Sequence, residues 1–138
     1  MADGGVDVRG PRFGAVLTSA VLAAVLVSGS GWLLACQAVV FAVGAAAGVR
    51  RSPYGWLFRV AVRPRLSPPE AFEDAAPPRF AQTVGLFFAI VGLAGYALGP
   101  QWLGPAATGC ALAAAFLNAA FGYCLGCEVY LLLRRAAG

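Results

Sequence analysis

The sequence predicts an all-α integral membrane protein with four transmembrane helices arranged as two hairpins. Its 138 residues are 60% apolar and only 12% charged, which is far from the composition of a soluble domain. Four apolar runs can be matched to the roughly 20 residues that cross a hydrocarbon core. The ten basic residues, all of them arginines, lie at or beyond the ends of these runs. These observations together predict the class.

Short links without charge join the expected spans in pairs. Gly29-Ser30-Gly31 connects the first pair and residues 99–105 connect the second, so each pair should form a tight helical hairpin. The expected spans cover residues 13–28, 32–49, 80–98 and 106–133. The chain then divides into a cytoplasmic N-terminal segment (1–12), a first hairpin (13–49), a cytoplasmic loop (50–79), a second hairpin (80–135) and a C-terminal tail (136–138).

The arginines predict the orientation. They precede the first span, occupy the central loop or follow the fourth span, and none lies in a hairpin link. The positive-inside rule then places both termini and the central loop in the cytoplasm, with the spans in the plasma (inner) membrane. Because the arginines mark the ends of apolar segments, the basic charge does not indicate nucleic-acid binding. The lipid bilayer is the expected partner.

Histidine is absent from the sequence. Histidine-ligated haem, histidine-containing zinc sites and histidine acid–base chemistry are therefore excluded within the chain. No cofactor is predicted.

The central loop carries an aromatic pattern. Tyr54, Leu57, Phe58 and Ala61 recur at helical spacing. This spacing suits a short helix lying in the headgroup region, and it equally suits an aromatic belt beside the end of a span.

The two halves of the chain share short sequence features. Pro11-Arg12-Phe13 precedes the first span and Pro78-Arg79-Phe80 precedes the third, while arginine pairs follow the second and fourth. Arginines are expected at the end of any span, so internal duplication and coincidence both stay open.

The most informative motif is Cys124-Leu-Gly-Cys127-Glu128, inside the fourth expected helix. Cysteines three residues apart share a helical face, and their Cα atoms come close to the separation that a disulfide needs. Carboxylates are rare in transmembrane helices and usually functional. Cys124 and Cys127 are therefore candidate catalytic residues, as a redox pair, with Glu128 as proton acceptor.

Two other interpretations of this motif stay open. Cys124 and Cys127 are also candidate ligands of a soft metal, although with Glu128 they supply only three ligands, so a tetrahedral site would need water or a second subunit. In the second interpretation the cysteines are packing residues and Glu128 extends toward Arg134 or Arg135.

The CxxC pair should lie near the C-terminal end of the fourth expected helix. Apolar burial, the negative end of the helix dipole and an ionised Glu128 would then oppose a reactive thiolate. Arg12 or Arg79 at the cytoplasmic rim would favour the thiolate. We therefore do not expect a site of the thioredoxin type, whose CxxC opens a helix.

Other small and sulfur-containing residues predict helix contacts. Cys110, Cys124 and Cys127 should form one stripe of the fourth helix, and Cys110 is placed to meet Cys36 near the outer turns. The Gly122–Gly126 spacing should pack against Gly44–Gly48 of the second span. The same faces would equally suit a homo-oligomer.

Three sequence runs together resemble a small bacterial integral-membrane family of unknown function with a C-terminal CLGCE signature. They are residues 6–13, residues 77–82 and residues 116–128, and the resemblance covers nearly the whole chain. It implies a four-span membrane protein with no established activity. It also implies a thioredoxin-like or sulfurtransferase partner.

Two functional classes follow from the sequence. The first is a membrane protein for thiol–disulfide redox chemistry or sulfur handling at Cys124 and Cys127. The second is a noncatalytic membrane subunit or scaffold. The sequence does not decide whether the protein is an enzyme.

Overall fold

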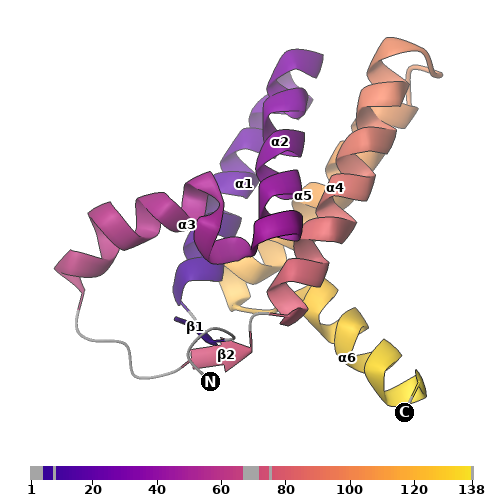
Figure 1. Ribbon diagram of the computed structural model, residues 1–138. Coiled ribbons are helices and arrows are strands. Elements are labelled where there is room, and N and C mark those ends of the chain that lie inside the picture. Colours follow the sequence, from indigo (N-terminus) through magenta and orange to yellow (C-terminus); the bar gives the residue numbers. More distant parts are fainter. Residues whose placement is uncertain (1–4, 8, 67–71, 75, 138) are drawn as a thin grey trace.

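The structure, a computed structural model, describes residues 5–7, 9–66, 72–74 and 76–137. Four long helices form the body, and three shorter helical segments and a strand pair lie at one end (Figure 1). The long helices are α1 (Arg9–Ser28), α2 (Gly31–Ala47), α4 (Ala76–Ala97) and α5 (Leu103–Phe121). The shorter segments are η1 (Val49–Arg51), α3 (Pro53–Leu57) with its continuations η2 (Phe58–Val62) and η3 (Arg63–Arg65), and α6 (Leu125–Ala137).

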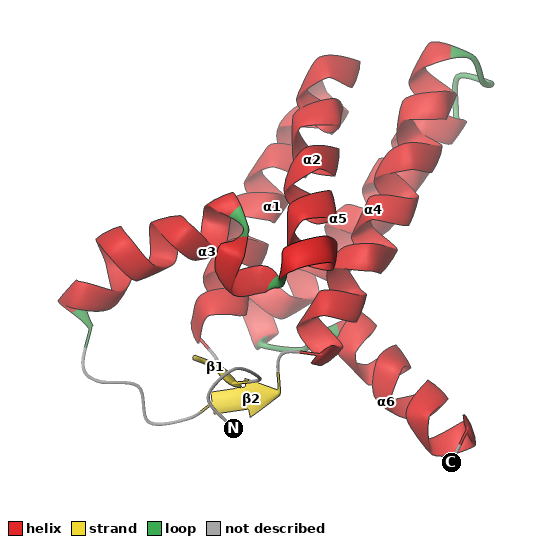
Figure 2. Ribbon diagram, viewed as in Figure 1, coloured by secondary structure: helices red, strands yellow, loops and turns green. Residues whose placement is uncertain are grey.

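The predicted all-helical class holds apart from a single strand pair among the described residues. Strand β1 (Gly5–Asp7) pairs antiparallel with β2 (Phe72–Asp74), with Val6 opposite Glu73. The pair lies at the end of the bundle from which α3 and α6 project (Figure 2). It joins the segment before α1 to the segment before α4.

The long helices pack across the two halves of the chain. Helix α2 packs along α4 and α1 along α5, and these contacts are more extensive than those between α1 and α2. The buried core contains small and aliphatic side chains together with one phenylalanine. Its members are Leu22, Val25, Leu34, Ala38, Phe41, Ala89 and Ala111.

The outer surface of the bundle is apolar. Val27 and Leu98 are each 90% exposed and Trp32 is 86% exposed, which would be costly in water. Helices α1, α4 and α5 are long and apolar enough to cross a membrane, and α2 is a shorter apolar helix of 17 residues. These properties are those of a membrane protein.

A chain of polar contacts connects α1, α2 and α3 inside this apolar body. The Tyr54 hydroxyl donates to Oε1 of Gln37 at 2.6 Å, and Nε2 of Gln37 donates to Oγ1 of Thr18 at 3.5 Å. Burial raises the pKa of the Tyr54 hydroxyl, and the neighbouring Cys36 adds to this effect. Tyr54 therefore stays a neutral donor at physiological pH and holds α3 against the bundle.

The helix predicted over residues 106–133 is not continuous. Helix α5 ends at Phe121, Gly122 takes the left-handed conformation with φ of 68°, and α6 begins at Leu125. A glycine in this conformation is the commonest way to end a helix. With 13 residues, α6 is too short to cross a bilayer, and it projects away from the bundle (Figure 1).

Equivalent contacts recur in the two halves of the chain. Arg12 donates from Nε and Nη2 to the carbonyls of Ala119 and Ala120 near the end of α5. Arg79 donates from the same two atoms to Ala45 and Ala46 near the end of α2. Each arginine of the Pro-Arg-Phe motif thus satisfies the free carbonyls at the end of a helix from the other half.

Candidate functional site

The two cysteines of the CxxC motif open helix α6. Cys124 directly precedes the helix, and its Sγ accepts a hydrogen bond from the backbone N–H of Cys127 at 3.1 Å. Its carbonyl accepts the N–H of Glu128. Cys124 therefore takes the place and the bonding of an N-cap residue. The pair was expected near the C-terminal end of a helix. This is wrong, because α5 ends at the turn around Gly122 and a new helix, α6, begins after it.

Cys124 and Cys127 form a disulfide, with their Cα atoms 5.2 Å apart. Both residues are partly buried. In the reduced pair, a thiolate at Cys124 would lie at the positive end of α6 within reach of the Cys127 N–H. Both effects stabilise the anion. The sequence had predicted the opposite, because it placed the pair at the negative end of a helix.

The structure places Glu128 in the first turn of α6, next to the cysteines in sequence and exposed. A carboxylate in the first turn stabilises a helix through its dipole. One interpretation had Glu128 extending toward Arg134 or Arg135. Glu128 forms no ion pair with either of these described residues, and Arg134 instead donates to the Tyr130 hydroxyl at 2.9 Å. Glu128 is thus exposed and is not buried in the bundle, and its role as a proton acceptor stays a prediction.

Helix α6 is held against the start of α4. The rings of Phe80 and Tyr130 lie 5.5 Å apart. A Cβ added at Gly126 would come within 2.7 Å of the Cβ of Ala81, so glycine is what permits this close approach. These contacts fix the direction in which the cysteine turn points.

The predicted contact between two GxxxG spacings is wrong. Gly126 lies against Ala81 of α4, and a Cβ at Gly44 would meet Gln82 of the same helix. Helix α4 therefore separates the two glycine pairs. Gly48 and Gly122 instead end α2 and α5, both with positive φ.

The other two cysteines do not bond to this pair. Cys36 and Cys110 are free and exposed, so the pairing expected between them is absent. The stripe that was to align Cys110 with Cys124 and Cys127 is also wrong, because the break at Gly122 places Cys110 on a different helix.

The described residues contain no group of three histidine, cysteine or acidic side chains placed to hold a metal ion. Cys124 and Cys127 would therefore need further ligands from elsewhere. The soft-metal interpretation stays a prediction.

A cavity of about 500 Å³ begins at the cysteine turn. Cys124, Gly126 and Val129 form one part of its wall, and residues of α1, α2, α4 and α5 form the rest, including Gln82, Asn118 and Cys110. One half of the disulfide therefore borders a space of the size that small molecules occupy.

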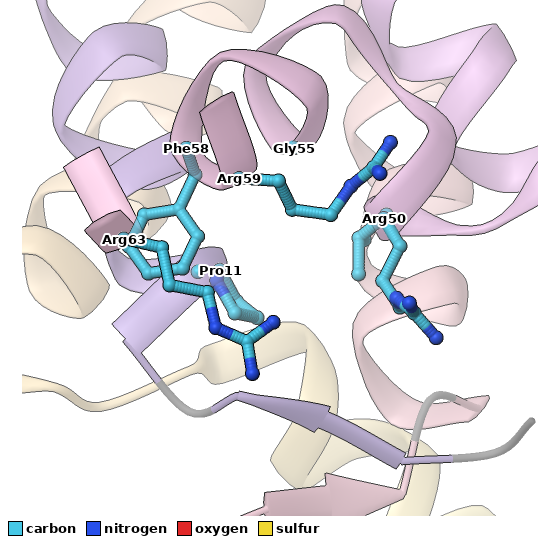
Figure 3. Close-up of a pocket in the computed structure, with 8 residues that line it drawn as sticks. Pro11, Arg50, Gly55, Phe58, Arg59 and Arg63 are labelled. Carbon is cyan, nitrogen blue, oxygen red and sulfur yellow. The ribbon is translucent and has the colours of Figure 1, made fainter. Parts of the chain in front are cut away.

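The first half of the chain has a smaller pocket beside α3 (Figure 3). Arg50, Arg59 and Arg63 line it together with Phe58 and Pro11, and its volume is about 30 Å³. This volume holds only one or two water molecules. The arginines here suit an aqueous boundary, and the space does not suit a ligand.

Sequence reasoning found the cysteine pair but missed two features that build its surroundings. One is Gly122, whose signal was the excess length of the fourth expected span over what a bilayer needs. The other is the role of Arg12 and Arg79, which was predicted only as a charge at the rim.

Among known proteins, neither the curated sequences nor the solved structures contain a match to the chain. The sequence profile of one family does match, over residues 6–135. The expected resemblance to a family of unknown function is thereby confirmed, and the chain belongs to the family described as "Domain of unknown function (DUF4395)".

Proposed function

We propose that the protein is a four-span inner-membrane thiol–disulfide protein with Cys124 and Cys127 as its redox pair. The observation that carries the proposal is the position of the pair at the start of α6. There the Cys127 N–H already donates to Cys124 Sγ, and the helix dipole favours a thiolate.

In the proposed reaction, the Cys124 thiolate attacks a disulfide of a partner and forms a mixed disulfide, releasing one partner thiolate. Cys127 then attacks Cys124 Sγ, which closes the intramolecular disulfide and releases the second partner thiolate. Glu128 accepts the Cys127 proton. Two electrons pass to the partner, and the reverse sequence oxidises it. A thioredoxin-like protein or a sulfurtransferase has the matching chemistry.

The four-span topology is part of the proposal. The uncharged links after α1 and α4 lie at one end of the bundle (Figure 1). The first turns of α1 and α4, the η1 turn after α2 and helix α6 lie at the other end, and these segments carry Arg12, Arg79, Arg50 and the last two arginines. We assign the arginine end to the cytoplasm. Reporter fusions at Ser30 and Gln101 should then give an outside signal, and those at Arg65 and Gly138 a cytoplasmic one. A cytoplasmic signal from either link would contradict four spans.

Thiol trapping in native membranes tests the redox pair. The background variant is Cys36→Ser with Cys110→Ala, so that only Cys124 and Cys127 react with a maleimide that shifts the mobility of the chain. Mild oxidation should protect both thiols and reduction should expose both. Cys127→Ser should leave Cys124 reactive under both conditions.

Two results would contradict the redox proposal. If both thiols stay open to alkylation after oxidation, the pair does not cycle. If they stay reduced while the purified chain retains zinc or copper, the soft-metal interpretation replaces it. Replacing Glu128 with Gln should slow oxidation and change its pH dependence, and an unchanged pH profile removes the proton-acceptor role.

A further inference from the structure

The cavity beside Cys124 has a cysteine of the redox pair in its wall, and its two amide side chains lie at one end. Gln82 and Asn118 lie at the arginine end, since Gln82 is one turn after Arg79 and the Asn118 carbonyl accepts the N–H of Gly122. Farther along the bundle the wall is mostly apolar, as at Phe88 and Ala111, and the Thr18 hydroxyl on it accepts a hydrogen bond from Gln37. A ligand with a polar head and an apolar tail fits this arrangement.

We propose that this cavity binds a membrane-soluble quinone, which oxidises the Cys124–Cys127 dithiol. The inference rests on the proposed function and names its electron acceptor. The quinone ring would lie near Cys124, with the amides of Gln82 and Asn118 donating to its carbonyl oxygens, and the isoprenoid tail would follow the apolar wall toward Cys110.

The reaction balances without another reactant. Two thiols lose two electrons and two protons as the S–S bond forms, and the quinone takes up both to become a quinol. In the bacterial periplasm, a membrane quinone accepts the electrons of dithiol oxidation. A quinone dissolved in the bilayer would reach the cavity from the lipid.

A phospholipid acyl chain is the competing occupant, because the cavity lies among apolar helices. Hydrocarbon offers no partner to amide groups, and unpaired amides in an apolar environment are costly. The amides at the head of the cavity and the sulfur in its wall therefore favour an occupant with acceptor oxygens and redox activity.

The test uses the full-length chain with Cys36→Ser and Cys110→Ala, reduced and placed in quinone-free nanodiscs without oxygen. The added probe is a fully substituted benzoquinone with a decyl tail, which has no free ring position for thiol addition. We expect one molecule of quinone, followed by its absorbance, to be consumed for each disulfide formed. The reaction rate should saturate as the quinone concentration rises. A rate that never saturates, or quinone loss without a disulfide, overturns the inference.

Two variants connect the reaction to the cavity. Ala114 lines the cavity, and Ala114→Phe should lower the quinone-dependent rate at least tenfold. Ala106 is exposed and outside the cavity wall, so Ala106→Phe is the matched control and should react like the parent. If Ala114→Phe folds poorly, Asn118→Leu replaces an amide with a side chain of similar size and should raise the half-saturating quinone concentration several-fold. Parent-like kinetics in the folded variants would exclude the cavity.

A chemical thiol oxidant separates this inference from the proposed function. If the oxidant forms the disulfide and the quinone does not, the quinone inference fails and the redox pair stands. If neither forms it, both fail. Tight retention of a phospholipid that blocks the quinone reaction would identify an acyl chain as the occupant and overturn the inference.

Discussion

The two halves of the chain contain the same kind of corner, and only one of them carries sulfur. We call residues 48–55 the first corner and residues 122–127 the second corner. Each begins with a glycine at positive φ that ends a long helix, Gly48 with φ of 99° and Gly122 with φ of 68°. In each, a side chain then caps the next helix: Ser52 accepts from the N–H of Gly55 at 3.2 Å, as Cys124 accepts from Cys127.

The elements that follow the two corners are held in equivalent ways. Phe58 packs against Phe13 of α1 with ring centres 5.7 Å apart, and Tyr130 packs against Phe80 of α4. Phe58 and Tyr130 each lie six residues after the capping residue, and Phe13 and Phe80 each follow a Pro-Arg pair. These parallels favour internal duplication over coincidence.

The difference between the corners explains why only the second can hold a cysteine pair. Three residues separate Gly48 from Ser52, and they form the tight turn η1, whereas one residue separates Gly122 from Cys124. The η1 turn places the carbonyls of Val49 and Arg50 where a Cβ at residue 55 would lie. At the second corner the shorter link leaves this space open for the Cys127 side chain.

The largest expected effect comes from transferring the cysteine pair to the first corner. The double variant Ser52→Cys with Gly55→Cys should form no second disulfide, because the residue-55 Cβ runs into the η1 backbone. Gly55→Ala alone should cost about 3 kcal/mol of stability, measured by unfolding in bicelles. Gly31→Ala, where a Cβ meets nothing within 4 Å, is the control. If thiol trapping detected a second disulfide, the first corner would have room for a cysteine side chain at residue 55, as the second corner has at Cys127.

The next effect tests whether the two arginines are equivalent. Arg12→Met and Arg79→Met each remove two charge-assisted hydrogen bonds to helix-end carbonyls, and each should cost about 2 kcal/mol. Arg65→Met, an exposed position beyond α3, should leave unfolding unchanged. Equal losses of unfolding free energy at Arg12 and Arg79 would support equivalent roles in the two halves. A loss at only one of them would show that the two arginines are not equivalent.

A smaller effect separates capping from redox chemistry. Under reducing conditions Cys124→Ser should keep the stability of the parent, because a serine caps the equivalent helix at Ser52, while Cys124→Ala should cost about 1 kcal/mol. Both should lose the oxidised species. Equal stability of the two variants, measured by thermal unfolding with reductant present, would mean that Cys124 does not act as a cap.

The smallest effect concerns the aromatic pairs. Phe13→Leu and Phe80→Leu should each cost about 1 kcal/mol, the usual value of a ring pair beyond its apolar area. Trp32→Leu is the control, since Trp32 is 86% exposed and lies at the start of α2, at the opposite end of that helix from the first corner. Only Phe80→Leu should also change the alkylation rate of Cys124, because only that pair holds α6. No change in the rate would separate α6 packing from the site.

The amino-acid pattern was enough to predict the helical class, the apolar surface and the arginines gathered at one end. These follow from local composition and periodicity, which need no knowledge of distant contacts. The cysteine pair was also visible, because its spacing alone brings two sulfurs within bonding reach.

Where α5 ends and what the cysteine pair faces could not be predicted from local sequence, because both depend on contacts between distant residues. Glycine is common in transmembrane helices, so Gly122 inside a long apolar run did not distinguish a tolerated helical residue from a helix end. The position of α6 depends on Ala81 approaching Gly126 and on Phe80 meeting Tyr130, across more than forty residues of chain. Those long-range contacts turn the second corner outward and place the disulfide beside the cavity.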